Sequence, residues 1–380
     1  MRKILYSIII LLIIIIVFLI TYKLYQRKSE ASTTIIINSE LAFDYNFENV
    51  YVISADYKDE GILLNLFIGG TLVPKLILDG EERTYSLNNI SNNIYTVLIN
   101  FNNLKNSTYK IYINTDKKHD LINNLDTLNK LVKGKVGNKL VTFDYTNNIM
   151  SFKTEDFNYE YDILIDPGHG GIDVGTSNNT MNESELNLIV SLYEKKRFEE
   201  LGLKVLLSRN DEKDGLMMGE SSWNRAKNRG YAIGYYGVTS KVVYSNHHNA
   251  SNTISDSGFE IITSNELETD FENKILKGII SIEPSNLINH LFNIYSRDIE
   301  TGIIYDKSDS QIYTYQDYYA TIRLPLKLYN VKTVTYEGCY MSNSDNFYWY
   351  YTLENYKKIS EIKIKYYVEL LGKTYNSPKN

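Results

Sequence analysis

The sequence predicts an α/β fold for the C-terminal part of the chain, with a mostly parallel sheet flanked by helices. A small all-β, sandwich-like domain and an N-terminal transmembrane helix are predicted to precede it. An apolar run opens the chain, short β-type runs fill its middle, and strand patterns alternate with helical patterns after about residue 159. We therefore expect a transmembrane signal anchor at 1–23, a linker at 24–40, a β-rich accessory domain at 41–158 and an α/β domain at 159–375.

The composition is that of a globular protein. The 380 residues, 43% hydrophobic and 23% charged, are enough for two domains and an anchor. The net charge is -6 and no basic stripe occurs beyond the N-terminal region, so we expect no nucleic-acid partner. Cys339 is the only cysteine, which excludes an internal disulfide and a four-cysteine metal site.

The first segment has the character of a membrane span. The run from Ile4 to Tyr22 is almost uniformly apolar, and its length is close to the roughly 20 residues that cross a bilayer as a helix. Ala31-Ser32 is a poor cleavage site, so an uncleaved signal anchor is favoured over a cleaved signal peptide. Basic residues flank both ends, and charge alone therefore leaves the orientation open. We expect a single-pass membrane protein.

The middle region contains short runs rich in β-branched and aromatic residues. Gly69-Gly70, Asp79-Gly80 and Asn-rich turns separate them, which is typical of a small sandwich. The expected strands are 50–53, 62–68, 76–78, 94–99 and 109–113. A short helix is expected at 119–132 and a hairpin at 139–153, around Asn147-Asn148. No catalytic constellation is visible here, so a binding module and a structural spacer are both compatible with this region.

The pattern changes to alternating strands and helices after about residue 159. A buried-type strand is expected at 161–165, followed by a helix at 185–201 that Gly202 ends. The further expected strands are 203–207, 241–244, 258–262 and 331–336. This alternation predicts a largely parallel sheet.

Polar residues follow several of these strands at the point where each ends. His169 follows the first strand, His247 follows 241–244, and Glu337 follows 331–336; Glu183 stands at the start of the helix. Open α/β sheets build their sites at the carboxyl ends of their strands. We therefore expect these four side chains to form one site.

Two histidines and a glutamate are a suitable ligand set for one zinc ion per chain. Three protein ligands leave a fourth position for water, which is typical of a catalytic zinc whose water has a pKa of about 7. A carboxylate outside the ligand set must then move the proton, and Glu337 is placed to do so. His248 competes with His247 as a ligand, but the adjacent residue of an extended chain points the other way. Glu185 competes with Glu183, and the alternative role for either is an acidic residue at a helix N-terminus.

These residues also form a recognisable set of motifs. The run from Asp166 to Gly175 reads DPGHGGIDVG, Ser245 to Ala250 reads SNHHNA, and Glu337 to Asn343 reads EGCYMSN. With Glu183 five residues before Leu188, the region 160–371 resembles the zinc-dependent N-acetylmuramoyl-L-alanine amidases of the amidase 3 family, including a closing helix near 353–371.

The resemblance implies a bacterial hydrolase that cuts the amide bond between N-acetylmuramic acid and L-alanine in peptidoglycan. It implies His169, Glu183 and His247 as zinc ligands, which selects Glu183 over Glu185 and His247 over His248. It also implies Glu337 as the catalytic residue. Because the substrate is the cell wall, we expect the catalytic domain at 159–375 to be extracellular. The resemblance leaves room for a protein activator, which the sequence does not identify.

The chain departs from the family pattern at several positions. Ser184 stands where the family usually has lysine, Asn246 replaces an apolar residue, and Gly338 follows Glu337 at once. The stretch 265–330 fits the family poorly and is interpreted as an inserted segment that shapes or covers the substrate groove.

Other functions are compatible with parts of this pattern. A zinc peptidase that cuts elsewhere in the stem peptide and an inactive wall-binding scaffold are the alternatives, although a scaffold would usually have lost a ligand. A cysteine hydrolase that uses Cys339 would leave the His-Glu-His set unexplained. Arg209 and Arg225 are candidates for binding substrate carboxylates, with a solvated helix face or a local ion pair as the alternative role.

Overall fold

The structure is a computed structural model. It describes residues 38–42, 50–68, 75–79, 83–91, 94–101, 104–114, 118–120, 122–123, 133–144, 151–210, 222–264, 267–282, 290–297, 302–306, 311–315 and 319–378. Within these ranges, no helix combines the length and the apolar character that a membrane crossing requires. The anchor expected at 1–23 lies outside the described residues.

A six-stranded sheet forms the centre of the C-terminal region. Its strand order is β15 (Val205–Leu207), β14 (Tyr161–Pro167), β16 (Ser240–Asn249), β21 (Val334–Tyr340), β17 (Ser257–Ser264) and β18 (His290–Arg297). The first four strands are parallel to one another, but β17 runs antiparallel to β21, and β18 is parallel to β17. The sheet is therefore mixed, and the expected parallel arrangement is correct for its first four strands.

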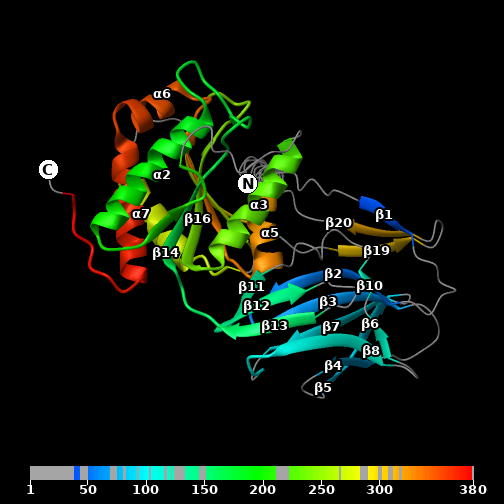
Figure 1. Cartoon of the computed structure of the whole chain (residues 1–380). Coiled ribbons are helices and arrows are strands. Elements are labelled where there is room, and N and C mark those ends of the chain that lie inside the picture. Colours follow the sequence, from blue (N-terminus) through cyan, green and yellow to red (C-terminus); the bar gives the residue numbers. More distant parts are fainter. Residues whose placement is uncertain are drawn as a thin grey trace, which may run out of the picture.

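Helices cover both faces of this sheet (Figure 1). On one face lie α2 (Glu183–Glu200) and α7 (Asn355–Leu370), with α4 (Asp270–Ile280) beside α7. On the other lie α3 (Ser222–Gly237) and α5 (Ala320–Tyr329). The pleat of β14 explains the two cores, because Ile163 and Ile165 pack with α2 and α7, whereas Leu164 packs with α3 and α5.

Two sheets make up the β-rich region. The first has the order β10 (Ile122–Asn123), β2 (Val50–Lys58), β3 (Gly61–Ile68), β7 (Ile94–Asn100) and β6 (Asn88–Ser91). The second has the order β11 (Lys133–Val136), β12 (Lys139–Asp144), β13 (Ser151–Asp156), β8 (Thr108–Asn114), β4 (Lys75–Asp79) and β5 (Arg83–Ser86), with β9 (Lys118–Asp120) paired to β8. Both sheets contribute to one hydrophobic cluster that also contains residues of α3 and α5. The β-rich region therefore packs directly against the α/β region.

Two local expectations in the β-rich region have different outcomes. The hairpin expected at 139–153 is confirmed, since β12 and β13 pair antiparallel from Lys139–Asp156 to Asp144–Ser151. The helix expected at 119–132 is wrong at its beginning, where β9 and β10 are strands. Pairing with β8 and β2 supplies the backbone hydrogen bonds that a local helix would have made. Residues 124–132 lie outside the described residues.

The described part of the stretch 265–330 has structure of its own. It contains α4, β18, the hairpin of β19 (Gly302–Asp306) and β20 (Gln311–Tyr315), and α5. Strand β18 extends the central sheet, while β20 pairs with β1 (Asn38–Ala42). The expected linker at 24–40 is therefore wrong for its last three residues, which belong to β1. The stretch thus contacts both the central sheet and a strand that precedes the β-rich region.

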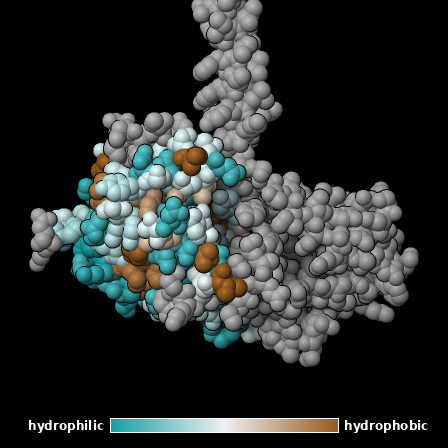
Figure 2. All heavy atoms as spheres, turned by 90° about the horizontal axis from the view of Figure 1, so that it is seen from above, coloured by the Kyte–Doolittle hydropathy of each residue, from teal (hydrophilic) through white to brown (hydrophobic). Residues whose placement is uncertain are grey.

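The short helix α6 (Ser344–Phe347) and the π-helical turn η3 (Tyr348–Thr352) follow β21. From above, the described surface is mainly hydrophilic, with separate hydrophobic spots (Figure 2). The described hydrophobic residues on this face therefore do not form one broad apolar patch.

Candidate active site

His169 lies in a tight loop after β14. Its backbone has a φ of 60°, which is unusual for a residue other than glycine. Two glycines of this loop have no room for a side chain. A Cβ on Gly168 would lie 2.3 Å from Nε2 of His247, and a Cβ on Gly175 would lie 2.6 Å from Oε2 of Glu183. The glycines of the DPGHGGIDVG run thus allow the loop to approach the other site residues closely.

Glu183 is the first residue of α2, and its rival Glu185 has a different role. The carboxylate of Glu185 accepts a hydrogen bond from the backbone N–H of Asn182 at 2.9 Å, which forms half of a capping box. Glu183 is 4% exposed and points toward the histidines instead. The structure therefore brings Glu183, and not Glu185, to the site.

His247 and Glu337 lie within strands rather than in the loops that follow them. Strand β16 continues to Asn249 and β21 to Tyr340, so the expected strand ends at 244 and 336 were too early. The reason is pairing between the strands: His247 and Glu337 are register partners in the parallel ladder. The ladder holds both side chains next to each other on one face of the sheet.

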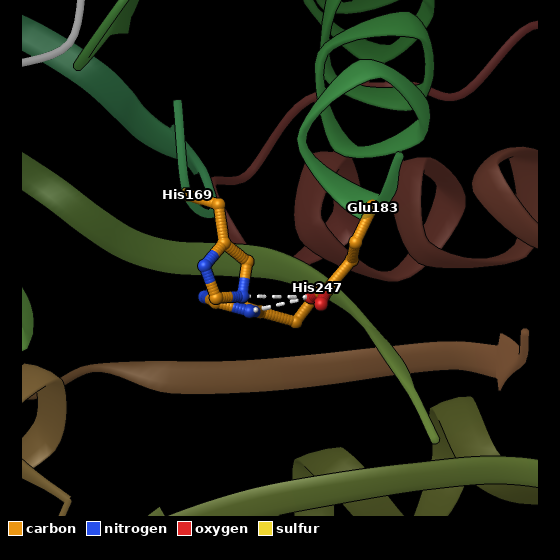
Figure 3. Close-up of side chains that lie close together, drawn as sticks. All are labelled: His169, Glu183 and His247. Carbon is orange, nitrogen blue, oxygen red and sulfur yellow. Dashed lines mark hydrogen bonds and ion pairs between the residues drawn. The ribbon is translucent and has the colours of Figure 1, made fainter. Parts of the chain in front are cut away.

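One carboxylate oxygen lies between the two histidines (Figure 3). Oε1 of Glu183 is 3.1 Å from Nε2 of His169 and 3.0 Å from Nδ1 of His247. The ligand atoms of the three residues all lie within 4.8 Å of one another. Among the described residues, no other His, Cys, Asp and Glu side chains form a group that meets this criterion. The structure therefore brings together the three expected ligands.

This arrangement fits a zinc ion. Donor atoms around a tetrahedral zinc with bonds of about 2.0–2.1 Å lie roughly 3.3 Å apart, close to the spacing of the three side chains. Nδ1 of His169 lies 3.1 Å from Oδ1 of Asp173, which leaves Nε2 directed toward Glu183. A carboxylate behind a ligating histidine is the usual support in zinc sites. Asp173 was not singled out from the sequence, although its place four residues after His169 in the motif was a usable signal.

The electrostatics of the three residues show how strongly they interact. Burial by itself would lower the pKa of His169, but Asp173 and Glu183 raise it to about 9. Burial would raise the pKa of Glu183, but the two histidines hold it well below its usual range. The pKa of His247 is lowered by burial. A metal ion that binds here must displace the His169 proton, so binding and deprotonation are coupled.

Further groups hold the Glu183 carboxylate in place. Its Oε2 accepts from the backbone N–H of Thr176 at 3.0 Å, and its Oε1 accepts from the backbone N–H of His248 at 3.1 Å and from Nδ2 of Asn187 at 3.4 Å. The His248 ring points the other way, with Nδ1 2.6 Å from Oδ1 of Asn187, and burial lowers its pKa to about 3. His248 is therefore a buried neutral residue that supports the site rather than a ligand in it.

Two buried arginines hold the carbonyl oxygens of the loop before His169. Arg209 donates to the carbonyls of Pro167 and Gly168, both at 2.9 Å, and is 1% exposed. Arg229 donates to the Pro167 carbonyl and pairs with Asp166 at 3.1 Å. Arg209 is thus a structural residue: its candidate role in binding substrate carboxylates is wrong, and so is the alternative of a solvated helix face. The Arg225 side chain lies outside what the structure describes.

Glu337 has an environment suited to holding a proton. Burial raises its pKa well above the usual value, and the nearby carboxylates of Glu183 and Glu260 raise it further. Glu260 is the register partner of Glu337 on β17 and is itself 4% exposed. The sequence gives no signal for Glu260, because nothing in the local pattern shows that β17 lies antiparallel beside β21.

The matched family model decides the identity of the protein. The N-acetylmuramoyl-L-alanine amidase model, Amidase_3, matches residues 163–365, which is more than half of the chain and includes all four site residues. The chain belongs to the N-acetylmuramoyl-L-alanine amidase family. The amidase hydrolyses the amide bond between N-acetylmuramic acid and L-alanine in peptidoglycan. Neither the zinc peptidase nor the inactive scaffold is supported by this match.

Several solved structures resemble the amidase over a little more than half of its length. The catalytic domain of CwlV, an N-acetylmuramoyl-L-alanine amidase from Bacillus (Paenibacillus) polymyxa var. colistinus, is 17% identical; the match covers 56% of this chain and 99% of that one, with a TM-score of 0.42. The CwlD amidase from Clostridioides difficile, solved in complex with the GerS lipoprotein, is 19% identical over 56% of this chain and 98% of that one, with a TM-score of 0.40. No curated protein matches the chain.

Proposed function

We propose that the amidase is zinc-dependent, with His169, Glu183 and His247 as the ligands of one zinc ion per chain and Glu337 as the catalytic acid–base. The observation that carries this proposal is the position of Oε1 of Glu183, within 3.1 Å of a nitrogen of each histidine. Three nitrogen and oxygen ligands with a further position open are typical of zinc hydrolases.

The roles of the chain's own residues follow from their positions. When bound, zinc acts as a Lewis acid toward water and the scissile carbonyl. Glu337 accepts a proton from the attacking water and delivers it to the nitrogen of L-alanine as the C–N bond breaks. A carboxyl whose pKa is raised by burial and by Glu183 holds that proton more readily at neutral pH than an exposed glutamate does. A bound cation acts in the opposite direction on this pKa and helps Glu337 to release the proton.

The products of digestion test the bond that is cut. We expect purified peptidoglycan treated with the amidase to gain free amino groups on L-alanine and no new reducing sugar ends. The reason is that hydrolysis of the muramoyl amide leaves both the glycan and the peptide backbone intact. Chain-end analysis with a Glu337→Gln digest as the background control measures this. New free amines on another residue of the stem peptide would instead support the zinc peptidase.

We further propose that residues 1–23 anchor the protein in the cell membrane through a single pass, that a linker connects this anchor to β1, and that the β-rich region 41–158 and the catalytic domain 159–375 are extracellular. The support is the apolar run from Ile4 to Tyr22 together with a substrate that lies outside the membrane.

A reporter protein fused after Asn380 tests this topology. We expect the reporter to behave as exported and to stay with the membrane fraction, because an uncleaved apolar helix retains the chain in the bilayer. A matched fusion without residues 1–23 should lose both export and membrane retention. Cytoplasmic reporter activity from the full-length fusion would show that the orientation is the reverse.

A further inference from the structure

A polar stripe on α2 faces β16 beneath the active site. Glu183, Asn187, Ser191 and Glu194 follow one another at helical spacing, and each is at most 4% exposed. Glu183 and Asn187 contact the site residues, and Ser191 and Glu194 lie further along the helix, toward its C-terminus. Ser191 Oγ and Glu194 Oε2 accept hydrogen bonds from the amide of Asn246, at 2.9 and 2.8 Å. One helix is thus hydrogen-bonded, step by step, to the strand that carries His247.

Lys363 of α7 places an ammonium group against the Glu194 end of this stripe. Its Nζ lies 2.6 Å from Oε1 of Glu194 and donates to Oδ1 of Asn246 at 2.7 Å. The same ammonium lies 4.7 Å from the ring centre of Tyr336. Lys363 is 2% exposed and Glu194 is fully buried, so this ion pair is shielded from water.

The contacts of Lys363 lie directly behind the site residues. Asn246 and Tyr336 are register partners, and so are the residues that follow them, His247 and Glu337. Successive side chains of a strand point to opposite faces of the sheet. Lys363 therefore contacts β16 and β21 on the face opposite to the side chains of His247 and Glu337. Asn246 stands where the family has an apolar residue, and its buried amide is satisfied by Ser191, Glu194 and Lys363.

We propose that Lys363 is a positioning residue of the amidase: through Glu194 and Asn246 it fixes α2 against β16 and β21, and so sets Glu183, His247 and Glu337 relative to one another. The part of this inference that concerns metal affinity rests on the proposed zinc site. The part that concerns the rate of hydrolysis rests only on the amidase activity.

The test compares two ion pairs that join the same helices, one buried and one partly exposed. Lys363→Met removes the pair behind the site. Arg197→Met removes a second α2–α7 pair, in which Nε of Arg197 lies 2.7 Å from Oε1 of Glu361 and which does not contact β16 in the described structure. The full chain, purified in detergent, is measured for thermal stability, for zinc affinity by competition with a chelator, and for kcat and KM on peptidoglycan.

We expect both variants to lose stability, but only Lys363→Met to lose zinc affinity and kcat, each by about 10- to 100-fold, as for other residues that orient metal ligands. KM should change little, because no substrate contact is removed. Equal effects of the two variants on zinc affinity and kcat would overturn the proposal, and so would a Lys363→Met variant that loses stability alone. If the unaltered protein binds no zinc, the proposed zinc site is wrong. The effect of Lys363→Met on kcat then still decides whether Lys363 is a positioning residue.

A second variant covers the case in which Lys363→Met does not fold. Lys363→Met combined with Glu194→Gln removes both charges and leaves no unpaired carboxylate in the core, so folding should be regained. Because Asn246 still lacks its ammonium partner, we expect kcat to stay low in this double variant. A double variant with the kcat of the unaltered protein would reduce Lys363 to a stabilising residue and refute the positioning role.

Discussion

Replacing His247 by alanine should abolish both zinc binding and peptidoglycan hydrolysis. The imidazole nitrogen that lies 3.0 Å from Oε1 of Glu183 is lost, and only two of the three ligands remain. A site of two ligands binds zinc far more weakly than one of three, and without the metal neither the water nor the carbonyl is activated. His169→Ala should behave in the same way. Metal analysis of the folded variant beside a wall-clearing assay measures both effects.

The neighbouring histidine provides the matched comparison. His248→Asn should retain about one zinc per chain in the folded fraction. The His248 ring hydrogen-bonds to Asn187 and is not part of the ligand group of His169, Glu183 and His247. For the unaltered protein, a chelator should stop hydrolysis and added zinc should restore it. Hydrolysis by the metal-free protein would contradict the need for zinc. A His248→Asn variant that loses zinc, together with a His247→Ala variant that keeps it, would contradict the assigned ligand set.

Glu337→Gln should leave zinc in place and slow hydrolysis by about 100- to 10,000-fold, which is the range of general acid–base catalysis. The substitution keeps the shape of the side chain but removes the group that accepts and returns the proton. Zinc should stay near one per chain, because Glu337 is not part of the group of ligand atoms around Glu183. Glu183→Ala should differ by losing zinc first and activity as a consequence.

Glu272→Gln is a suitable control for this change. Glu272 on α4 is 4% exposed and burial raises its pKa, as it does that of Glu337, but Glu272 lies outside the site. Its replacement should leave kcat unaltered. Normal activity in Glu337→Gln would remove this residue from the mechanism, and loss of zinc in that variant would make it a fourth ligand.

The site residues could be predicted from the sequence because their signals are local. His169 and its glycines form a contiguous loop motif, and Glu183 begins a helix whose period is visible in the chain. Residues that support the site give a weaker signal. Asp173 and Asn187 stand four positions after a ligand and contact it, but a carboxylate or an amide at that spacing is common without any such role.

Strand direction and strand ends were decided by tertiary structure. The patterns of β17 and β21 indicate two buried strands, but their antiparallel pairing depends on the path of the chain between them. The same pairing places Glu260 beside Glu337, which no local pattern indicates. Likewise, β16 and β21 extend past their apolar residues because each supplies hydrogen-bond partners for the other.

The sequence by itself thus determined the class of fold, the motif residues and the chemistry that they support. Only the tertiary structure decided how the polar residues of the interior are satisfied. Asn246 departs from the family pattern, and its partner Lys363 lies 117 residues away in the chain. A buried amide or ammonium is stable only where partners surround it, and those partners come from elements that meet only in the folded protein.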